Sequence, residues 1–236
     1  MQTKIVIFDY DGTLTKTKKG GNCWLYIWQL INATDEDEYH YNKYRNHEYA
    51  DYKEWLFAVI ESFKKHKVNR QMMTEIASSS CLVADLEFVF KQLCESGISI
   101  YVLSGGIKNI IELNLKNLSK YIKSIEAYGF KFDNDGIICD VDIPNHCPEN
   151  KQEFINRVIK EENILPNQVL FVGNGENDET ASLTGVRTLC FNPDDAHFLN
   201  KEIWHDVIWS NSMKDILKFV ENSHILTKDS KEMRCN

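Results

Sequence analysis

The chain has 236 residues, with 27 Lys and Arg against 35 Asp and Glu, and its formal net charge is −8. This acidic balance argues against a nucleic-acid surface, and no apolar run approaches the roughly 18 residues that span a bilayer. The seven cysteines are scattered and lack the Cys-x-x-Cys pairs of a zinc site. The sequence opens on a strand pattern and not on the basic and apolar regions typical of a signal peptide, so we expect none. We therefore expect a cytoplasmic protein, a monomer or homodimer, without nucleic-acid or membrane partners.

Residues 4–8 are mostly aliphatic and predict a buried strand. Asp9 and Asp11 follow directly, and Gly12 permits a tight turn there. Ligands of open α/β sheets lie beyond the carboxyl ends of the strands, so both carboxylates are expected to face one crevice. Such close carboxylates repel unless one is protonated or a cation lies between them, and Mg2+ takes oxygen ligands. The alternative is an ordinary Asp-Gly turn.

The next segment, residues 16–81, has no convincing strand and predicts a helical insert. Helices are expected at 24–31, with Asn22 as a possible cap, at 55–63 and at 71–77, and a polar acidic break at 34–38 and a tyrosine-rich stretch at 39–52 separate the first two. The aromatic residues of the insert either form its own core or stack on a flat or apolar ligand. Lys16, Lys18 and Lys19 are either a solvated joint or a contact for negative charge.

From residue 82 the chain alternates strands and helices. Strands are expected at 98–103, 124–127, 168–172, 188–191 and 206–209, helices at 85–95, 108–118, 151–161 and 212–221, and a hairpin turn at 133–136. This rhythm predicts an α/β fold with a Rossmann-like parallel sheet covered on both faces. The expected domains are a core of residues 1–15 and 82–236 and a cap of residues 16–81, inserted after the first strand.

Three more loops carry polar groups suited to a phosphate. Ser104 and Gly105 follow a predicted strand, where a hydroxyl and backbone N–H groups can cradle phosphate oxygens. Lys151 opens a predicted helix, where a cation opposes the helix dipole. The Gly-rich segment 173–178 follows another strand but lacks the third glycine of a dinucleotide fingerprint. Taken singly, these are also a plain loop, a surface lysine and a simple turn.

Taken together and in this order, the segment Asp9-Tyr10-Asp11-Gly12-Thr13-Leu14-Thr15, Ser104, Lys151 and the loop 173–178 resemble the four motifs of the haloacid dehalogenase-like hydrolases. The spacing is most similar to the phosphoserine-phosphatase-like branch with a small helical cap. The resemblance implies a Mg2+-dependent phosphomonoester phosphatase that works through an aspartyl-phosphate on a small phosphorylated metabolite.

The resemblance also implies a role for each residue. Asp9 matches the nucleophile, Asp11 the general acid/base, and Lys151 the lysine that offsets negative charge. The expected phosphate-binding residues are Ser104, Gly105 and Asn177, and the expected metal-binding residues are Asp9, Asp11, Asn174 and Asp178.

Two positions depart from the family pattern. Relatives commonly have Asp where this chain has Asn174, so we expect weaker metal binding. A catalytically weak relative that binds a phosphorylated ligand or a protein partner is therefore the alternative. Phosphoserine phosphatases usually carry Glu where Lys18 stands, which argues against phosphoserine itself as the substrate. Carbon–halogen hydrolysis is disfavoured because dehalogenases of the superfamily lack the second aspartate, here Asp11.

Overall fold

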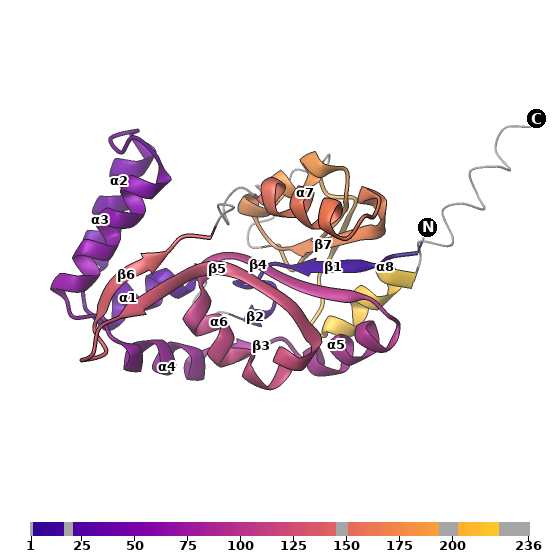
Figure 1. Cartoon of the computed structure of the whole chain (residues 1–236), viewed down its shortest axis with the longest axis horizontal. Coiled ribbons are helices and arrows are strands. Elements are labelled where there is room, and N and C mark those ends of the chain that lie inside the picture. The colour runs from indigo at the N-terminus through magenta and orange to yellow at the C-terminus, as the bar shows by residue number, and fades with distance from the viewer. Residues whose placement is uncertain (1, 17–20, 145–150, 194–202, 222–236) are drawn as a thin grey trace, which may run out of the picture.

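The computed structural model describes residues 2–16, 21–144, 151–193 and 203–221 (Figure 1). Its main feature is a seven-stranded sheet in the order β6-β5-β4-β1-β7-β8-β9, and all neighbours in it are parallel except β5 and β6. The strands of this sheet are β1 (Ile5–Phe8), β4 (Ser99–Ile107), β5 (Ile122–Phe132), β6 (Ile138–Asp142), β7 (Val169–Gly173), β8 (Arg187–Phe191) and β9 (Asp206–Ile208). The predicted α/β fold with a Rossmann-like parallel sheet is confirmed.

Helices account for most of the remaining structure. The α-helices are α1 (Cys23–Leu30), α2 (Thr34–Arg45), α3 (Tyr52–Lys65), α4 (Arg70–Ser79), α5 (Leu86–Glu95), α6 (Lys108–Asn114), α7 (Lys151–Glu161) and α8 (Leu217–Glu221). Short 3-10 helices are η1 (Lys116–Tyr121), η2 (Pro166–Gln168), η3 (Glu176–Thr184) and η4 (Met213–Ile216). No helix in the described ranges is long and apolar enough to cross a membrane.

Strand β1 is central and apolar on both faces. Val6 and Phe8 pack into a cluster with α5, η4 and α8, whereas Ile5 and Ile7 pack into a second cluster with α7. All four side chains are buried, and each contributes about 1.5–3 kcal/mol by leaving water. Successive side chains of a strand point to opposite faces, so both faces of the sheet at β1 are covered by helices. The residue after Phe8 lies at the carboxyl edge of the sheet.

A third apolar cluster joins α1, α3 and α4 to the β5–β6 hairpin. It contains Trp28, Phe63, Phe130 and Ile138, and Figure 1 shows α2 and α3 standing beside β6 at one end of the molecule. Two short antiparallel strands, β2 (Thr15–Lys16) and β3 (Cys81–Leu82), flank the four helices. The division into a core and a cap of residues 16–81 stays a prediction.

The predicted acidic break at 34–38 is wrong, because these residues form the first turns of α2. Asp35, Glu36 and Asp37 lie in the first turn, and Lys43 and Arg45 lie in the last. Both placements are favourable for the helix dipole. His40 is the helix's buried residue, so the helix lacks the apolar stripe by which a sequence pattern reveals a helix.

Two boundaries also differ from the prediction. The expected strand at 124–127 is part of a longer strand, β5, which continues to the hairpin turn, and the expected helix at 108–118 ends at Asn114 and continues as η1. The expected hairpin at 133–136 is confirmed, with the carboxylate of Asp133 accepting hydrogen bonds from the N–H groups of Asp135 and Ile137.

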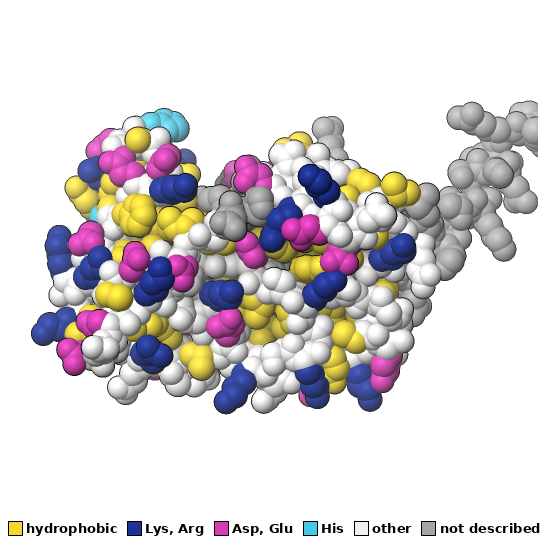
Figure 2. All heavy atoms as spheres, in the orientation of Figure 1, with side chains coloured by type: hydrophobic (Ala, Val, Ile, Leu, Met, Phe, Trp, Pro, Cys, Tyr) yellow, Lys and Arg dark blue, Asp and Glu magenta, His cyan; other side chains and the backbone are white. Residues whose placement is uncertain are grey.

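Figure 2 shows acidic and basic side chains interspersed over the visible face of the described residues, which is not the basic stripe of a nucleic-acid-binding surface.

Candidate active site

The candidate site lies where β1, β4 and β7 end. Asp9 directly follows β1, Ser104 lies in β4, and Asn174 directly follows β7. The two outer strands both pair in parallel with β1, and the N–H of Asp9 donates to the carbonyl of Val172 at 2.9 Å. The carboxyl ends of parallel strands meet at one edge of the sheet, which is the usual ligand site of such folds. The structure therefore brings these sequence-predicted residues together.

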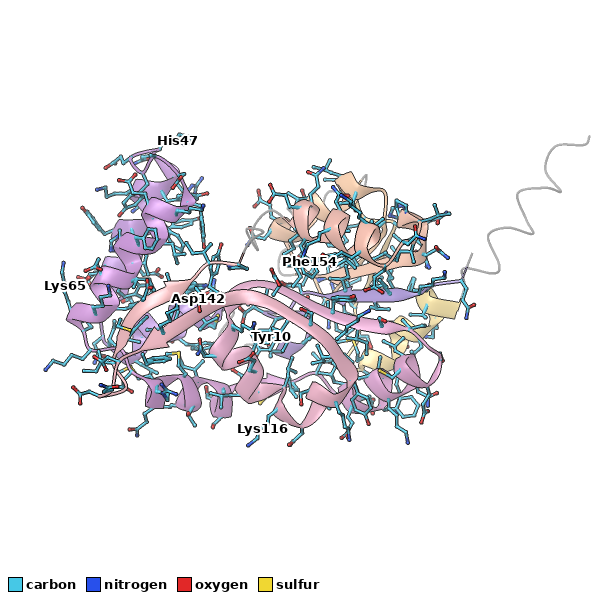
Figure 3. The ribbon with its side chains drawn as sticks, in the orientation of Figure 1. Tyr10, His47, Lys65, Lys116, Asp142 and Phe154 are labelled. Carbon is cyan, nitrogen blue, oxygen red and sulfur yellow. The ribbon has the colours of Figure 1, made fainter. Side chains whose placement is uncertain are left out.

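Tyr10 separates the two carboxylates of the first motif. Its ring is buried among the residues that pack with α5, and its carbonyl accepts hydrogen bonds from the N–H groups of Thr13 and Leu14. Figure 3 labels Tyr10 at the end of β1 and Phe154 on α7, on opposite sides of the sheet. The buried ring and the closed turn anchor the loop that carries Asp9 and Asp11.

Lys151 is the buried cation of the site. Its side chain is 2% exposed, and its Nζ donates to Asp9 Oδ1 at 2.7 Å and to Asp178 Oδ1. The other oxygen of Asp178 accepts from the backbone N–H groups of Asn174 at 2.7 Å and Gly175 at 3.1 Å. Asp178 thus orients the lysine and fixes the loop after β7.

These contacts set the charges of the site. Burial raises the pKa of Asp9 to about 7, although Lys151 opposes the shift and the nearby charge of Asp178 adds to it. Burial alone would lower the pKa of Lys151, but the carboxylates of Asp178 and Asp9 outweigh burial and raise it. The lysine therefore stays charged and places a fixed positive charge in the site, which would favour an anion there.

Asp11 and Ser104 converge on Gly106. Ser104 is 1% exposed, and its Oγ accepts a hydrogen bond from the N–H of Gly106 at 3.0 Å. A Cβ added to Gly106 would lie 2.9 Å from Asp11 Oδ2 and 3.1 Å from Ser104 Oγ. The absence of a side chain at Gly106 thus lets the carboxylate approach the serine loop, and the two predicted functional groups share one side of the site.

Two residues of α1 also reach this place, and sequence reasoning missed both. Cys23 Sγ donates to Asp11 Oδ2 at 3.4 Å, and Trp24 Nε1 donates to the carbonyl of Gly105 at 2.9 Å. Burial, reinforced by the charge of Asp11, raises the pKa of Cys23 well above its usual value. The signal in the sequence is Asn22, which caps α1 and so places both residues in the first turn of the helix.

Asn174 is held by the first motif. The hydroxyl of Thr13 donates to Asn174 Oδ1 at 3.1 Å, while Asn174 Nδ2 is buried without a hydrogen-bond partner among the described residues. Gly12 has φ +81°, and a Cβ there would lie 2.2 Å from that nitrogen. The orientation of an amide is assigned from its hydrogen bonds. Turned over, the amide would donate to Thr13 and present its oxygen to a cation.

The oxygen atoms that these residues offer as ligands therefore suit a hard cation, which binds amide and backbone carbonyl oxygens. Within the described ranges there is no group of three or more His, Cys, Asp or Glu side chains placed to hold a metal ion. The orphaned amide of Asn174 stands beside the motif that carries Asp9 and Asp11, and its oxygen can replace a third carboxylate. Residues of this kind fit Mg2+, with fewer negative charges than a site of three carboxylates.

The remaining predicted residues differ in how the structure places them. Asn177 lies in η3 with an exposed side chain, and Gly105 is partly buried in β4. Lys18 and Lys19, expected to be either part of a solvated joint or a contact for negative charge, lie outside the described residues.

Comparisons with known proteins give the family and the fold of the chain. A model of the haloacid dehalogenase-like hydrolase family matches residues 3–182. A substrate-bound phosphoserine phosphatase structure is 18% identical in sequence and has a TM-score of 0.72. The match covers 94% of this chain and 100% of the phosphatase chain. A probable phosphoserine phosphatase from Vibrio cholerae is 12% identical, with a TM-score of 0.77, covering 97% of this chain and 67% of its own. No protein with a curated description matches significantly. The likeness to these solved structures is one of fold.

Proposed function

Because the chain belongs to the haloacid dehalogenase-like hydrolases, we propose that it is a Mg2+-dependent phosphomonoester phosphatase. Its substrate is a small phosphorylated metabolite, and its intermediate is an aspartyl-phosphate on Asp9. The observation that carries the proposal is the buried contact between Asp9 and Lys151, 2.7 Å long, at the carboxyl edge of the sheet. A carboxylate can attack a phosphate dianion only where positive charge offsets the repulsion between them.

The reaction proceeds in two displacements at phosphorus. A carboxylate oxygen of Asp9 forms a bond to phosphorus while the bond from phosphorus to the leaving oxygen breaks, and Asp11 donates a proton to that oxygen. In the second displacement Asp11 takes a proton from a water molecule, whose oxygen attacks phosphorus and frees Asp9. Inorganic phosphate and the alcohol are the products.

The other residues bind and neutralise the phosphoryl group. The hydroxyl of Ser104 and the backbone N–H of Gly105 bind its oxygens, and Lys151 offsets the charge that develops on them. Asp178 keeps Lys151 in place through their contact. Asn177 is exposed on η3, where it stabilises the loop or contacts the phosphate as it enters.

Mg2+ supplies further neutralisation of the phosphoryl group and of the attacking carboxylate when it is bound. The residues that would hold it are Asp9, Asp11 through its carbonyl, Asn174 and Asp178. The orphaned amide of Asn174 supports this assignment.

Lys18 and the aromatic residues of the insert bear on the identity of the leaving group. One solved structure of similar fold is described as a phospho-aspartyl intermediate analogue of phosphoserine phosphatase, at 18% identity. Lys18 replaces the glutamate that such enzymes usually carry, so phosphoserine itself is not favoured. The aromatic side chains of α1 and α3, Trp24 and Trp55 among them, pack against one another in the apolar cluster of α1, α3 and α4, as expected for side chains that form the core of the insert.

The proposal is tested by phosphate release from an aryl phosphate, with Mg2+ and with EDTA, beside Asp9→Asn as the control. We expect release that needs Mg2+ and is abolished in the variant. A second readout is independent of turnover, namely the rise in unfolding temperature on adding Mg2+ alone. Release that persists in Asp9→Asn, or the absence of both release and a Mg2+ shift in the wild type, would contradict the proposal.

The second candidate is a catalytically weak relative that binds a phosphorylated ligand or a protein partner. It is favoured by Asn174, which removes one negative charge from the metal-binding loop, and by the lack of a three-carboxylate cluster among the described residues. In that case phosphorylated metabolites would raise the unfolding temperature of the wild type, and none of them would be hydrolysed.

A further inference from the structure

The first turn of α1 is attached to both loops that face the phosphate site. Cys23 Sγ lies 3.4 Å from Asp11 Oδ2, and Trp24 Nε1 donates to the carbonyl of Gly105 at 2.9 Å. Cys23 is 2% exposed and Trp24 is 8% exposed. Trp24 also packs against Phe63 and Phe130, with ring centroids 6.2 and 5.5 Å away. The position of the thiol relative to Asp11 is therefore fixed by a packed helix and not by a free loop.

The hydrogen bonds fix the direction in which the thiol donates. The backbone N–H of Ile107 donates to Cys23 Sγ at 3.3 Å, and an amide N–H can act only as a donor. The sulfur therefore accepts on that side, and its own proton is free to point to the carboxylate of Asp11. The resulting chain runs from Ile107 through Cys23 to Asp11.

We propose that Cys23 is a positioning residue for the general acid, and that its thiol holds the carboxylate of Asp11 in the orientation that protonates the leaving oxygen. This inference rests on the proposed phosphatase function and adds to it a residue outside the four family motifs. The thiol contacts neither phosphorus nor the leaving group in this scheme. It acts through Asp11.

Orientation matters here because Asp11 is the proposed general acid and its side chain is partly exposed. General acid catalysis requires the acid within hydrogen-bond reach of the leaving oxygen, and small displacements of an aligned group cost large factors in rate. Gly106 leaves room for the contact, since a Cβ there would lie 2.9 Å from both Asp11 Oδ2 and Cys23 Sγ. A thiol is a weak hydrogen-bond donor. The Cys23 thiol can therefore orient the carboxylate of Asp11 without strongly hindering the hydrogen bond between Asp11 and the leaving oxygen.

The experiment compares two substrates of similar shape, phenyl phosphate and p-nitrophenyl phosphate. Phenolate needs a proton in order to leave, whereas p-nitrophenolate leaves readily without one. The parameter is kcat/KM, which reports only the steps up to departure of the leaving group. Cys23→Ala and Cys23→Val both remove the donor, one with a smaller and one with a larger side chain, so that a failure of one variant to fold leaves the other. Cys23→Ser keeps a donor.

Cys94→Ala is the matched control. The thiol of Cys94 donates to the carbonyl of Tyr121, also at 3.4 Å, but it lies on α5 and contacts the residue just before β5, at the amino edge of the sheet. Cys94→Ala thus removes the same thiol group as Cys23→Ala, from a sulfur hydrogen bond of equal length, but outside the site.

We expect Cys23→Ala and Cys23→Val to lower kcat/KM for phenyl phosphate about tenfold more than for p-nitrophenyl phosphate, a part of the general-acid contribution. Cys23→Ser restores the wild-type ratio of the two values, and Cys94→Ala retains it. An unchanged ratio in both donor-lacking variants, with an active wild type, overturns the role of Cys23 alone. A wild type that hydrolyses neither substrate at saturating Mg2+ overturns the phosphatase function and this inference together.

Discussion

The ammonium group of Lys151 lies 2.7 Å from the carboxylate of Asp9, and both side chains are almost completely buried. The same ammonium contacts Asp178, so one cation serves two carboxylates. Removing one partner of a buried pair leaves the other charge without compensation, which is strongly destabilising.

Lys151→Met is accordingly predicted to lower both stability and activity. The free energy of unfolding should fall by about 3–5 kcal/mol, measured by urea unfolding without metal, and phosphate release should fall by at least roughly a hundredfold. Adding Asp9→Asn to Lys151→Met should recover part of the lost stability, because one of the two stranded carboxylates is then neutral. Equal stability of Lys151→Met and the wild type would mean that the buried contact does not form.

Asn174→Asp is predicted to lower the unfolding temperature of the metal-free protein and to increase the rise in unfolding temperature that Mg2+ produces. Without metal, a third carboxylate near Asp9 and Asp178 adds repulsion, so the unfolding temperature should fall. With Mg2+, the added charge should tighten binding and produce a larger thermal shift than in the wild type. The measurement is the unfolding temperature across a Mg2+ titration. Equal Mg2+ dependence in the two proteins would show that this side chain does not reach the ion.

Gly106→Ala is predicted to disturb the site sterically. A Cβ would lie 2.9 Å from Asp11 Oδ2 and from Cys23 Sγ, whereas a Cβ on Gly105 would meet nothing within 4 Å. Overpacking a buried position typically costs about 1–3 kcal/mol, so Gly106→Ala should unfold at lower urea concentration than Gly105→Ala, which serves as the control for stability. If both variants unfold at the same urea concentration, the close approach at Gly106 is not present in solution.

His40 is predicted to make stability depend on pH. Its Nδ1 lies 2.7 Å from the Tyr49 hydroxyl and its Nε2 3.0 Å from Ser62 Oγ. Burial lowers the pKa of His40 below its usual value of 6.5; Glu36 opposes the shift, and Lys43 and Lys65 add to it. The unfolded chain therefore binds a proton that the folded chain binds less readily.

The stability that neutral His40 provides is fully present above its usual pKa and is lost as pH falls from that value through its lower folded pKa. His40→Gln should remove this part of the pH dependence. The test is urea unfolding of both proteins at about pH 8 and about pH 5. The wild type should lose more stability than the variant on acidification, and equal losses would rule out a contribution from His40.

The sequence was sufficient to place most of the site, since parallel topology brings strand ends together. Asp9, Ser104 and Asn174 could be predicted to converge because each follows or ends a strand pattern, and Lys151 because it opens a helix. Helix α2 could not be predicted, because its polar side chains leave no apolar stripe. The contact of Cys23 with Asp11 was also hidden, since it depends on how α1 packs against β4 and not on any local pattern.

The central claim is that Asp9 carries the phosphoryl group during turnover. The most direct measurement is acid quenching of the protein during hydrolysis of a radiolabelled phosphate ester in the presence of Mg2+, followed by treatment with hydroxylamine, which cleaves acyl phosphates. We predict label on the wild-type protein, localised to the peptide that contains Asp9, released by hydroxylamine and absent from Asp9→Asn. Steady hydrolysis by the wild type with no hydroxylamine-sensitive label, or with equal label on Asp9→Asn, would contradict the account.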